Sequence, residues 1–269
     1  MSLVSLSDLD KSRRTRDLCH ALGRIKHKYL VMSGKGGVGK TTVAVNLAAA
    51  KAMGGARVGL LDVDLHGPSV ALALGLDQAI GFDDEGKLNP LVSEYGLNVV
   101  SIQGLLSETD EAVIWRGPKK IRAIRQFFSE TAWGDLDYLF IDAPPGTGDE
   151  AMTVLQVVED VRPLMVTSGS RLAVGDVAKV LNFLTVMKRP AFGLIGNQSW
   201  YICPNCGQET DLYDRRAALG LAEKNRLKLL ADLPMDLAAA RSAEEGRPLV
   251  WSRPDQAFAL LIKELADSL

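Results

Sequence analysis

The sequence predicts an α/β fold, with a doubly wound, mostly parallel sheet and helices on both faces. The first observation is that short apolar runs alternate along the chain with segments of helical periodicity. The second is that several apolar runs end in an acidic or small polar residue, as strands do at the ligand-binding edge of such sheets. The third is the composition of the 269 residues, 47% hydrophobic and 24% charged, which excludes a disordered or collagen-like chain.

The expected strands share a short apolar run bounded by polar or turn-forming residues, and they span 29–33, 57–62, 97–102, 138–142, 164–167, 192–196 and 227–231. The expected helices lie between and after them, at 40–53, 119–131, 150–158, 172–187, 214–223, 236–243 and 256–268. No low-complexity linker or internal repeat divides this alternation. We therefore expect a charged N-terminal leader over 1–24 and one domain over 25–269, with an insertion at 200–214.

Charge and hydropathy argue against nucleic acid and membranes as binding partners. Lys and Arg number 31 against 33 Asp and Glu, a formal net charge of −2, which argues against gripping nucleic acid or an anionic membrane by bulk charge. No stretch approaches the roughly 20 apolar residues of a spanning helix. Residues 1–28 lack the apolar core of an export signal. We expect a cytoplasmic location, free thiols, no nucleic-acid partner and no membrane partner.

A glycine-rich loop predicts the phosphate site. Residues 34–41 read G-K-G-G-V-G-K-T, which satisfies the G-x-x-x-x-G-K-[ST] pattern between an apolar strand and an Ala-rich helix. Glycines let backbone N–H groups curl around an anion, and the helix N-terminus adds its dipole; the alternative is a turn without a ligand. Lys40 should reach the β- and γ-phosphates of ATP, and the Thr41 hydroxyl should bind Mg²⁺. The expected nucleotide-binding set of the loop is Gly34, Lys35, Gly36, Gly37, Val38, Gly39, Lys40, Thr41 and Thr42.

Two acidic strand ends complete the predicted chemistry. Asp142 ends the apolar run L-F-I-D, a Walker B pattern, and is expected to hold Mg²⁺. Asp64 ends D-V-D at 62–64 and can order the attacking water or the Mg²⁺ shell, although it could instead cap the next helix. Residues 143–149, A-P-P-G-T-G-D, suit a second switch loop or a plain tight turn. The combination with the glycine-rich loop predicts nucleotide hydrolysis.

The cysteines predict half of a metal site. Cys203 and Cys206 lie in C-P-N-C-G, a turn that points two thiols at one place. Two thiolates cannot close a tetrahedral site, but a symmetric dimer supplies two more. Sulfur ligation fits both an iron–sulfur cluster and Zn²⁺. A thioredoxin-type redox pair is disfavoured because the motif does not begin a helix in the usual βα position.

Several strings resemble known families. K-G-G-V-G-K-T-T at 35–42 resembles the deviant Walker A class of P-loop NTPases, the MinD/ParA-like superfamily. From about residue 25 to the C-terminus the chain is similar to Mrp/ApbC-type iron–sulfur cluster carrier ATPases, through D-L-H-G-P-S at 64–69, W-R-G-P at 115–118, I-D-A-P-P-G-T-G-D at 141–149 and G-N-Q-S-W-Y-I-C-P-N-C-G at 196–207. It departs from that family at T-S-G-S (167–170), where T-T-P-Q is usual, and at G-N-Q-S, where E-N-M-S is usual.

The resemblance implies a role for each site residue. Lys35 would act across a homodimer interface, and Asp64 would activate water in a switch that responds to the γ-phosphate. Asn197, whose carboxamide can pair with an adenine edge, and Pro234 would contact the base. Cys203 and Cys206 would bridge a [4Fe–4S] cluster between subunits. The implied catalytic set is Lys35, Lys40, Asp64 and Asp142.

The resemblance also implies the overall activity, an ATPase that hands its cluster to apo iron–sulfur client proteins. The alternatives are a MinD/ParA-like positioning ATPase with structural zinc or free cysteines, and an electron donor like the nitrogenase iron protein. A membrane-bound positioning ATPase would carry a basic amphipathic C-terminal helix, whereas residues 257–269 contain Lys263, Glu264 and Asp267. The cluster cysteines of the nitrogenase iron protein are widely separated, unlike the pair here.

Overall fold

The computed structural model describes residues 6–105, 117–203, 205–214 and 216–269, with side chains from residue 15 onward. Within them one sheet has the strand order β10-β7-β6-β1-β5-β2-β4-β3. Every neighbouring pair is parallel except β3 with β4. The strands are β1 (Ile25–Ser33), β2 (Val58–Asp62), β3 (Leu91–Val92), β4 (Asn98–Val100), β5 (Leu136–Asp142), β6 (Arg162–Ser168), β7 (Gly193–Asn197) and β10 (Leu229–Asp232). The predicted mostly parallel sheet is confirmed.

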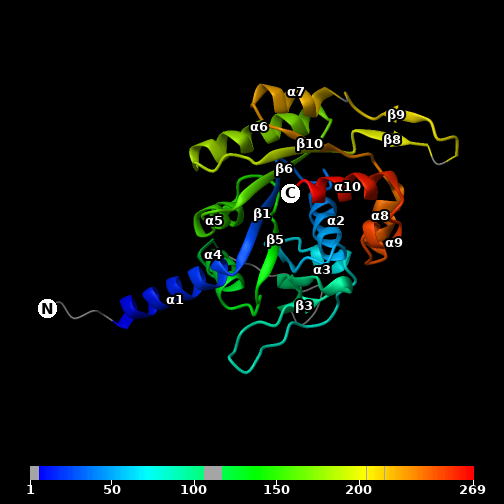
Figure 1. The fold of residues 1–269 in the computed structure, drawn as a ribbon. Helices are drawn as coiled ribbons and strands as arrows, with labels where there is room; N and C mark the ends of the chain where they lie inside the picture. Colours follow the sequence, from blue (N-terminus) through cyan, green and yellow to red (C-terminus); the bar gives the residue numbers. More distant parts are fainter. Residues whose placement is uncertain (1–5, 106–116, 204, 215) are drawn as a thin grey trace.

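Helices cover both faces of this sheet (Figure 1). They are α1 (Leu6–Gly23), α2 (Lys40–Met53), α3 (Val70–Ala73), α4 (Gly117–Ser129), α5 (Asp149–Val157), α6 (Arg171–Val186), α7 (Arg216–Lys224), α8 (Leu237–Glu244), α9 (Leu249–Ser252) and α10 (Ala257–Asp267), with short 3₁₀ helices η1 (Glu94–Gly96) and η2 (Ile102–Leu105). The side-chain alternation of a strand explains the two layers, because successive residues of β1 enter different cores. Leu30 and Met32 pack with α4, α5, α6 and α7, whereas Tyr29 and Val31 pack with α2, α9 and α10.

The phosphate-site edge is built by the carboxyl ends of the central strands. β1 leads into residues 34–39 and then α2, while β2 and β5 both end in aspartate, paired in register as Asp62 and Asp142. β7 ends in Asn197. Because β1 lies between β5 and β6, the loops after all of these strands meet at one edge of the sheet.

A small hairpin interrupts the alternation between β7 and α7. β8 (Trp200–Ile202) pairs antiparallel with β9 (Glu209–Asp211), and the hairpin extends away from the body of the protein (Figure 1). It lies within the predicted insertion at 200–214. Pro204, part of the predicted C-P-N-C-G turn, falls outside the described residues, as do Trp115 and Arg116 of W-R-G-P.

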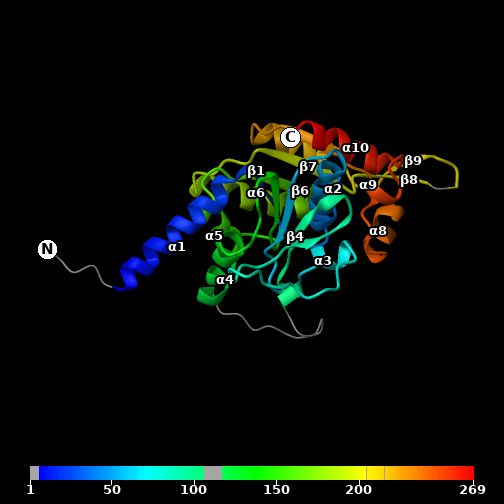
Figure 2. The same cartoon turned by 60° about the horizontal axis from the view of Figure 1, so that its bottom comes forward.

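The N-terminal segment is helical, which the sequence did not indicate. α1 projects from the body of the fold (Figures 1 and 2). Its C-terminal part is anchored by Leu18, a buried residue of the core cluster that includes α4. Across the described residues, none of the helices has the length and apolar character that a membrane crossing requires.

Candidate functional site

The loop after β1 is shaped for an anion by its glycines. Gly37 (φ +81°) and Gly39 (φ +79°) have the left-handed conformation that side chains disfavour. Gly34 and Gly39 also lack room: a Cβ on Gly34 would overlap the backbone of α6, and one on Gly39 would overlap the Asn197 amide. The loop can therefore turn tightly and approach its neighbours closely, as a backbone that curls around a phosphate must.

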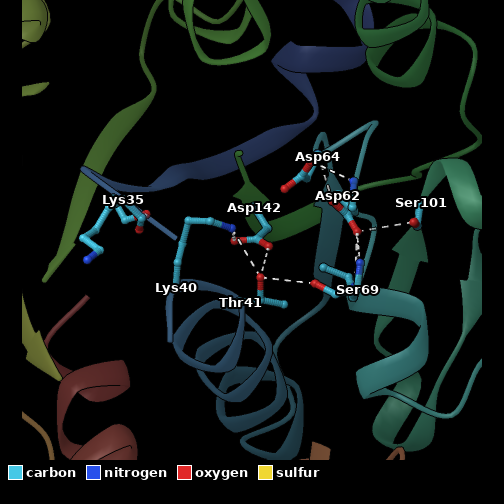
Figure 3. A network of polar contacts seen from close by, with 11 residues as sticks. Lys35, Lys40, Thr41, Asp62, Asp64, Ser69, Ser101 and Asp142 are labelled. Carbon is cyan, nitrogen blue, oxygen red and sulfur yellow. Dashed lines mark hydrogen bonds and ion pairs between the residues drawn. The ribbon is translucent and has the colours of Figure 1, made fainter. Parts of the chain in front are cut away.

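Lys40, Thr41 and Asp142 form one buried polar cluster at the start of α2 (Figure 3). Lys40 Nζ lies 2.5 Å from Asp142 Oδ1, and Thr41 Oγ1 donates to Asp142 Oδ2 at 2.6 Å. Asp142 is 1% exposed and Lys40 8%. The hydroxyl and carboxylate oxygens form a donor set that suits Mg²⁺, and the lysine supplies a charge for phosphate oxygens. The structure thus brings together the three residues that the motifs predict.

Asp62 is a site residue that the predictions missed. Its Oδ2 accepts the backbone N–H groups of Ser69 (3.0 Å) and Val70 (3.2 Å), and its Oδ1 accepts that of Asp64 (2.9 Å). Full burial raises the pKa of Asp62 to about 7, with the nearby Asp142 carboxylate adding to the rise. Asp62 therefore ties together both ends of residues 64–69, the predicted first switch segment. The available signal was the D-V-D pair itself, in which the first carboxylate ends the buried strand.

Asp64 and Lys35 occupy more open positions. Asp64 is half-buried, and its Oδ1 accepts the N–H groups of Gly67 (3.1 Å) and His66 (3.3 Å). This is the local turn that the alternative interpretation expected, and it leaves the other carboxylate oxygen, Oδ2, for water. Lys35 is exposed and its side chain extends away from Lys40 and Asp142 (Figure 3).

The structure assigns Asn197 a contact with the phosphate loop. Asn197 is 3% exposed, and its Nδ2 donates to the carbonyl of Val38 at 2.8 Å. Pro234 follows β10 and lines a cavity of about 280 Å³ together with Met235 and Arg241. Asn197 therefore fixes the conformation of the loop, a role that the sequence motif did not indicate.

The loop at 143–149, the predicted second switch, is braced by a buried ion pair. Glu150, at the start of α5, accepts a 2.7 Å bond from Lys120 of α4, and their side chains are 5% and 14% exposed. On the other side of the loop, the Gly146 N–H donates to Ser33 O at 2.8 Å. The loop that follows Asp142 is thus held to both α4 and the end of β1. No motif pointed to Lys120 or Glu150.

The two cysteines meet at the tip of the β8–β9 hairpin. Cys203 N–H donates to Gln208 O at 3.0 Å, and Gly207 N–H donates to Cys203 O at 2.8 Å, which closes a tight turn. Backbone N–H groups of Asn205 and Cys206, and then the Cys206 side chain, lower the pKa of the Cys203 thiol below its usual value. A favoured thiolate is what a soft metal or a cluster iron binds.

The cysteine pair is an incomplete metal site. Cys203 is half-buried and Cys206 exposed, while Cys19 lies exposed on α1. In the part of the chain that the structure describes, no group of three or more His, Cys, Asp or Glu residues could hold a metal ion. Further ligands therefore have to come from outside this set of residues.

Sequence comparisons show the family of the chain. Residues 24–269 match the ParA family model described as NUBPL iron-transfer P-loop NTPase. The chain is 38% identical over 251 residues to an iron-sulfur cluster carrier protein of Methanocaldococcus jannaschii, covering 92% of this chain and 87% of that protein. It is 42% identical over 253 residues to a cytosolic Fe-S cluster assembly factor NUBP2 homolog of Culex quinquefasciatus, covering 92% of this chain and 98% of that protein.

Solved structures agree on the architecture. A nucleotide-binding protein of Archaeoglobus fulgidus in complex with ADP superposes with a TM-score of 0.77 at 34% identity, covering 88% of this chain and 93% of that one. The cell division ATPase MinD of Pyrococcus furiosus superposes with a TM-score of 0.66 at 24% identity, covering 90% and 97%, which supports the fold alone.

Proposed function

The chain belongs to the ParA family of P-loop NTPases, in the group described as NUBPL iron-transfer P-loop NTPases, and from this membership we propose that it is an ATP-hydrolysing iron–sulfur cluster carrier. In this proposal Cys203 and Cys206 hold a [4Fe–4S] cluster together with the same cysteines of a second copy. The cluster is cargo, delivered to apo iron–sulfur proteins in the cytoplasm. Relatives named as cluster carriers and cytosolic assembly factors support the class.

The observation that carries the proposal is that one fold contains both a candidate nucleotide site and a pair of cysteines on a hairpin. The Lys40–Thr41–Asp142 cluster fits Mg–ATP, and the hairpin presents two thiols, one with a lowered pKa, that no third described ligand completes. A positioning ATPase has no need of a favoured thiolate at an exposed hairpin tip. The pairing therefore favours nucleotide-dependent handling of a thiophilic cargo.

The incompleteness of the cysteine site supports a dimer. A second copy related by a two-fold axis would supply two more thiolates and close a four-sulfur set. The edge that carries Lys35 also exposes large apolar side chains: Leu172, at the start of α6, is 73% exposed, and Tyr213, which packs against Gly169, is 45% exposed. Large exposed apolar side chains on one edge are typical of a surface that becomes covered.

In the proposed reaction each residue acts on a defined atom. The loop N–H groups and Lys40 Nζ bind phosphate oxygens. Thr41 Oγ1 and Asp142 would hold Mg²⁺, and the ion would supply positive charge against the developing negative charge of the phosphates. Asp64 orients the attacking water through its carboxylate, and Asn197 keeps the loop in place from Val38. Pro234 and Asn197 border the base, and the partner copy's lysine equivalent to Lys35 reaches the phosphates.

Anaerobic reconstitution tests the cluster. The full chain, supplied with ferrous iron, sulfide and reductant, is expected to bind about four irons per dimer, measured by iron assay and sedimentation. Cys203→Ser and Cys206→Ser are each expected to lose the iron while retaining ATP binding. Cys19→Ser is the matched control, because Cys19 lies on α1, and it should bind iron as the unmodified chain does.

Three outcomes would contradict the proposal. Iron that remains after both hairpin substitutions would place it elsewhere. Zinc taken up in preference to the cluster, with no transfer to an apo-ferredoxin acceptor, would favour a structural role for the pair. A monomer that binds its full iron content would exclude the shared site.

A further inference from the structure

Residues that flank helix α8 contact the cysteine hairpin on one side and, on the other, the residues that follow α3. Just before its N-terminus, Met235 N–H donates to Trp200 O at 2.7 Å, at the first residue of β8. Just after its C-terminus, Gly246 packs against Gly75, which follows α3. Figure 1 shows α8 below the hairpin and beside α3. A two-turn helix is stiff along its axis, so displacement of one end reaches the other.

The contact between α3 and α8 is backbone against backbone. Gly75 (φ +64°) and Gly246 (φ +68°) both have left-handed conformations. A Cβ on Gly246 would lie 2.6 Å from Gly75 Cα and 2.7 Å from Gly75 N. With no side chain between the two segments, no rotamer change can absorb a movement of α3.

The other end of α3 contacts the Mg²⁺-binding cluster. Ser69, which precedes the helix, donates from Oγ to Thr41 Oγ1 at 3.4 Å, and its N–H is bound by Asp62. Figure 3 shows this chain of contacts from Asp142 through Thr41 to Ser69. A cavity of about 210 Å³ lies between the two helices, bordered by Ser69 and Leu72 on one side and by Ser242 and Ala243 on the other.

The hairpin end of α8 is close to Cys203 along the chain. Tyr201 forms an isolated parallel bridge with Met235, and Cys203 directly follows the last residue of β8. The turn that lowers the pKa of the Cys203 thiol is anchored on this strand. Met235 and the cysteine turn are therefore connected through the three residues of β8.

We propose that α8 couples the two sites, so that the nucleotide bound at Thr41 changes the accessibility of the Cys203 thiol through the Gly75–Gly246 contact. The inference rests on two parts of the proposed function: nucleotide binds at Thr41, and the cysteine hairpin holds the iron–sulfur cluster. Without nucleotide, the Thr41 hydroxyl is hydrogen-bonded to both Asp142 and Ser69. Mg–nucleotide would compete for this hydroxyl, so the contacts of Ser69 would differ between the free and the nucleotide-bound protein. Such a difference in contacts is what a ligand needs in order to shift a conformational equilibrium. Coupling is reciprocal, so cargo on the hairpin changes nucleotide affinity by the same factor.

Cysteine alkylation measures the coupling without a client protein. The reduced, metal-free full chain is treated with iodoacetamide, and modification of Cys203 is followed by mass spectrometry of the peptide. The rate is expected to differ roughly five-fold or more between Mg–ADP and Mg²⁺ with a non-hydrolysable ATP analogue. Gly246→Ala, whose Cβ pushes α8 away from Gly75, is expected to abolish that difference. The affinity of Gly246→Ala for a fluorescent ADP should stay within about twofold of the original.

Two further variants keep the test decisive. Gly86→Ala imposes a comparable backbone strain (φ +77°) in a turn where the new Cβ meets nothing within 4 Å, and it should retain the full nucleotide effect. Gly75→Ala places its Cβ 3.0 Å from Gly246 O, a milder clash, and should reduce the effect partially. This variant also serves if Gly246→Ala fails to fold.

Either of two results would overturn the coupling: an unchanged nucleotide effect in a folded Gly246→Ala chain, or no nucleotide effect on Cys203 in the original chain. Iron binding by Cys203 and Cys206, measured on the same preparation, separates this failure from failure of the proposed function. A chain that binds iron and hydrolyses ATP but shows no nucleotide effect lacks only the coupling.

Discussion

Asp142 is the residue on which the nucleotide site converges. It is buried, it accepts bonds from both Lys40 and Thr41, and it lies in register with Asp62 across neighbouring strands. The two carboxylates differ in their surroundings, since Asp142 has a lysine partner and Asp62 is satisfied by backbone N–H groups. The same residue type thus has a lysine and a hydroxyl as partners at one position, and backbone N–H groups as partners at the other.

Asp64→Asn separates water activation from loop structure. The substitution keeps the Oδ1 acceptor for His66 and Gly67, so the turn should remain folded. Loss of the carboxylate is expected to lower kcat for ATP hydrolysis by about 10²-fold or more. ATP binding, measured by calorimetry, should be unchanged. Hydrolysis within twofold of the original chain would show that Asp64 is only a cap.

The reactivity of Cys203 is expected to depend on pH with a shifted midpoint. Because N–H groups of Asn205 and Cys206 stabilise the thiolate, the pKa of Cys203 lies below its usual value in the folded chain. The alkylation rate of Cys203 should therefore approach its plateau at lower pH in the metal-free folded chain than in urea. Coincident folded and unfolded pH profiles would contradict the thiolate-stabilising turn.

Sequence motifs predicted those residues of the candidate nucleotide site whose positions follow from a local strand–turn–helix arrangement. The glycine-rich loop, Lys40, Thr41 and Asp142 come together as expected because the pattern specifies a strand, a turn and a helix N-terminus. Asp62 and the Asn197–Val38 bond were missed because they depend on how segments far apart in the chain meet. The spacing of residues in a motif does not predict contacts between segments that are far apart in the chain.

At the element scale, strongly periodic segments were predicted well. α2 spans residues 40–53 as predicted, because its apolar face is continuous and a glycine stands at each end. β1 begins at Ile25, earlier than the expected residue 29, because its first residues alternate with charged ones. α1 was not predicted, since its sequence has few apolar residues and no continuous stripe.

The Lys120–Glu150 pair between α4 and α5 should be costly to break. Glu150→Gln leaves Lys120 buried without its counter-charge, and the free energy of unfolding is expected to fall by about 3 kcal/mol. Urea denaturation measures the change. Glu85→Gln, which breaks the exposed pair with Lys87, is the control and should cost less than about 1 kcal/mol. Equal effects of the two substitutions would mean that burial does not strengthen the pair.

At the scale of the whole molecule, the carboxyl edge of the sheet gathers the segments that we propose to bind nucleotide. The phosphate loop, both switch segments and Lys35 lie along it, and the hairpin rises beside its β7–β10 end. The opposite edge is covered by ordinary turns and surface ion pairs such as Arg57 with Asp137. A second copy that docks on the carboxyl edge would therefore contact all of the functional groups at once.

Lys35→Ala tests that assembly. Lys35 is exposed and its side chain points away from the Lys40 cluster, so its removal should leave ATP binding to the monomer unchanged. Dimer formation with Mg²⁺ and a non-hydrolysable ATP analogue is expected to weaken by about tenfold or more, measured by analytical ultracentrifugation. Lys263→Ala, on α10, is the control. Equal dimerisation of the two variants would exclude a role for Lys35 across the interface.

Because Lys40 and Asp142 are paired with each other, binding of Mg–ATP would require each of them to exchange its partner for a new counter-charge. Before ATP arrives, the lysine and the aspartate neutralise each other inside the fold. Phosphate can take the lysine only if Asp142 receives another cation, and Mg²⁺ can take the aspartate only if Lys40 receives another anion. If Asp142 holds Mg²⁺ as proposed, metal and nucleotide each supply the counter-charge that the other displaces, and we expect the site to bind the two together more tightly than either one alone.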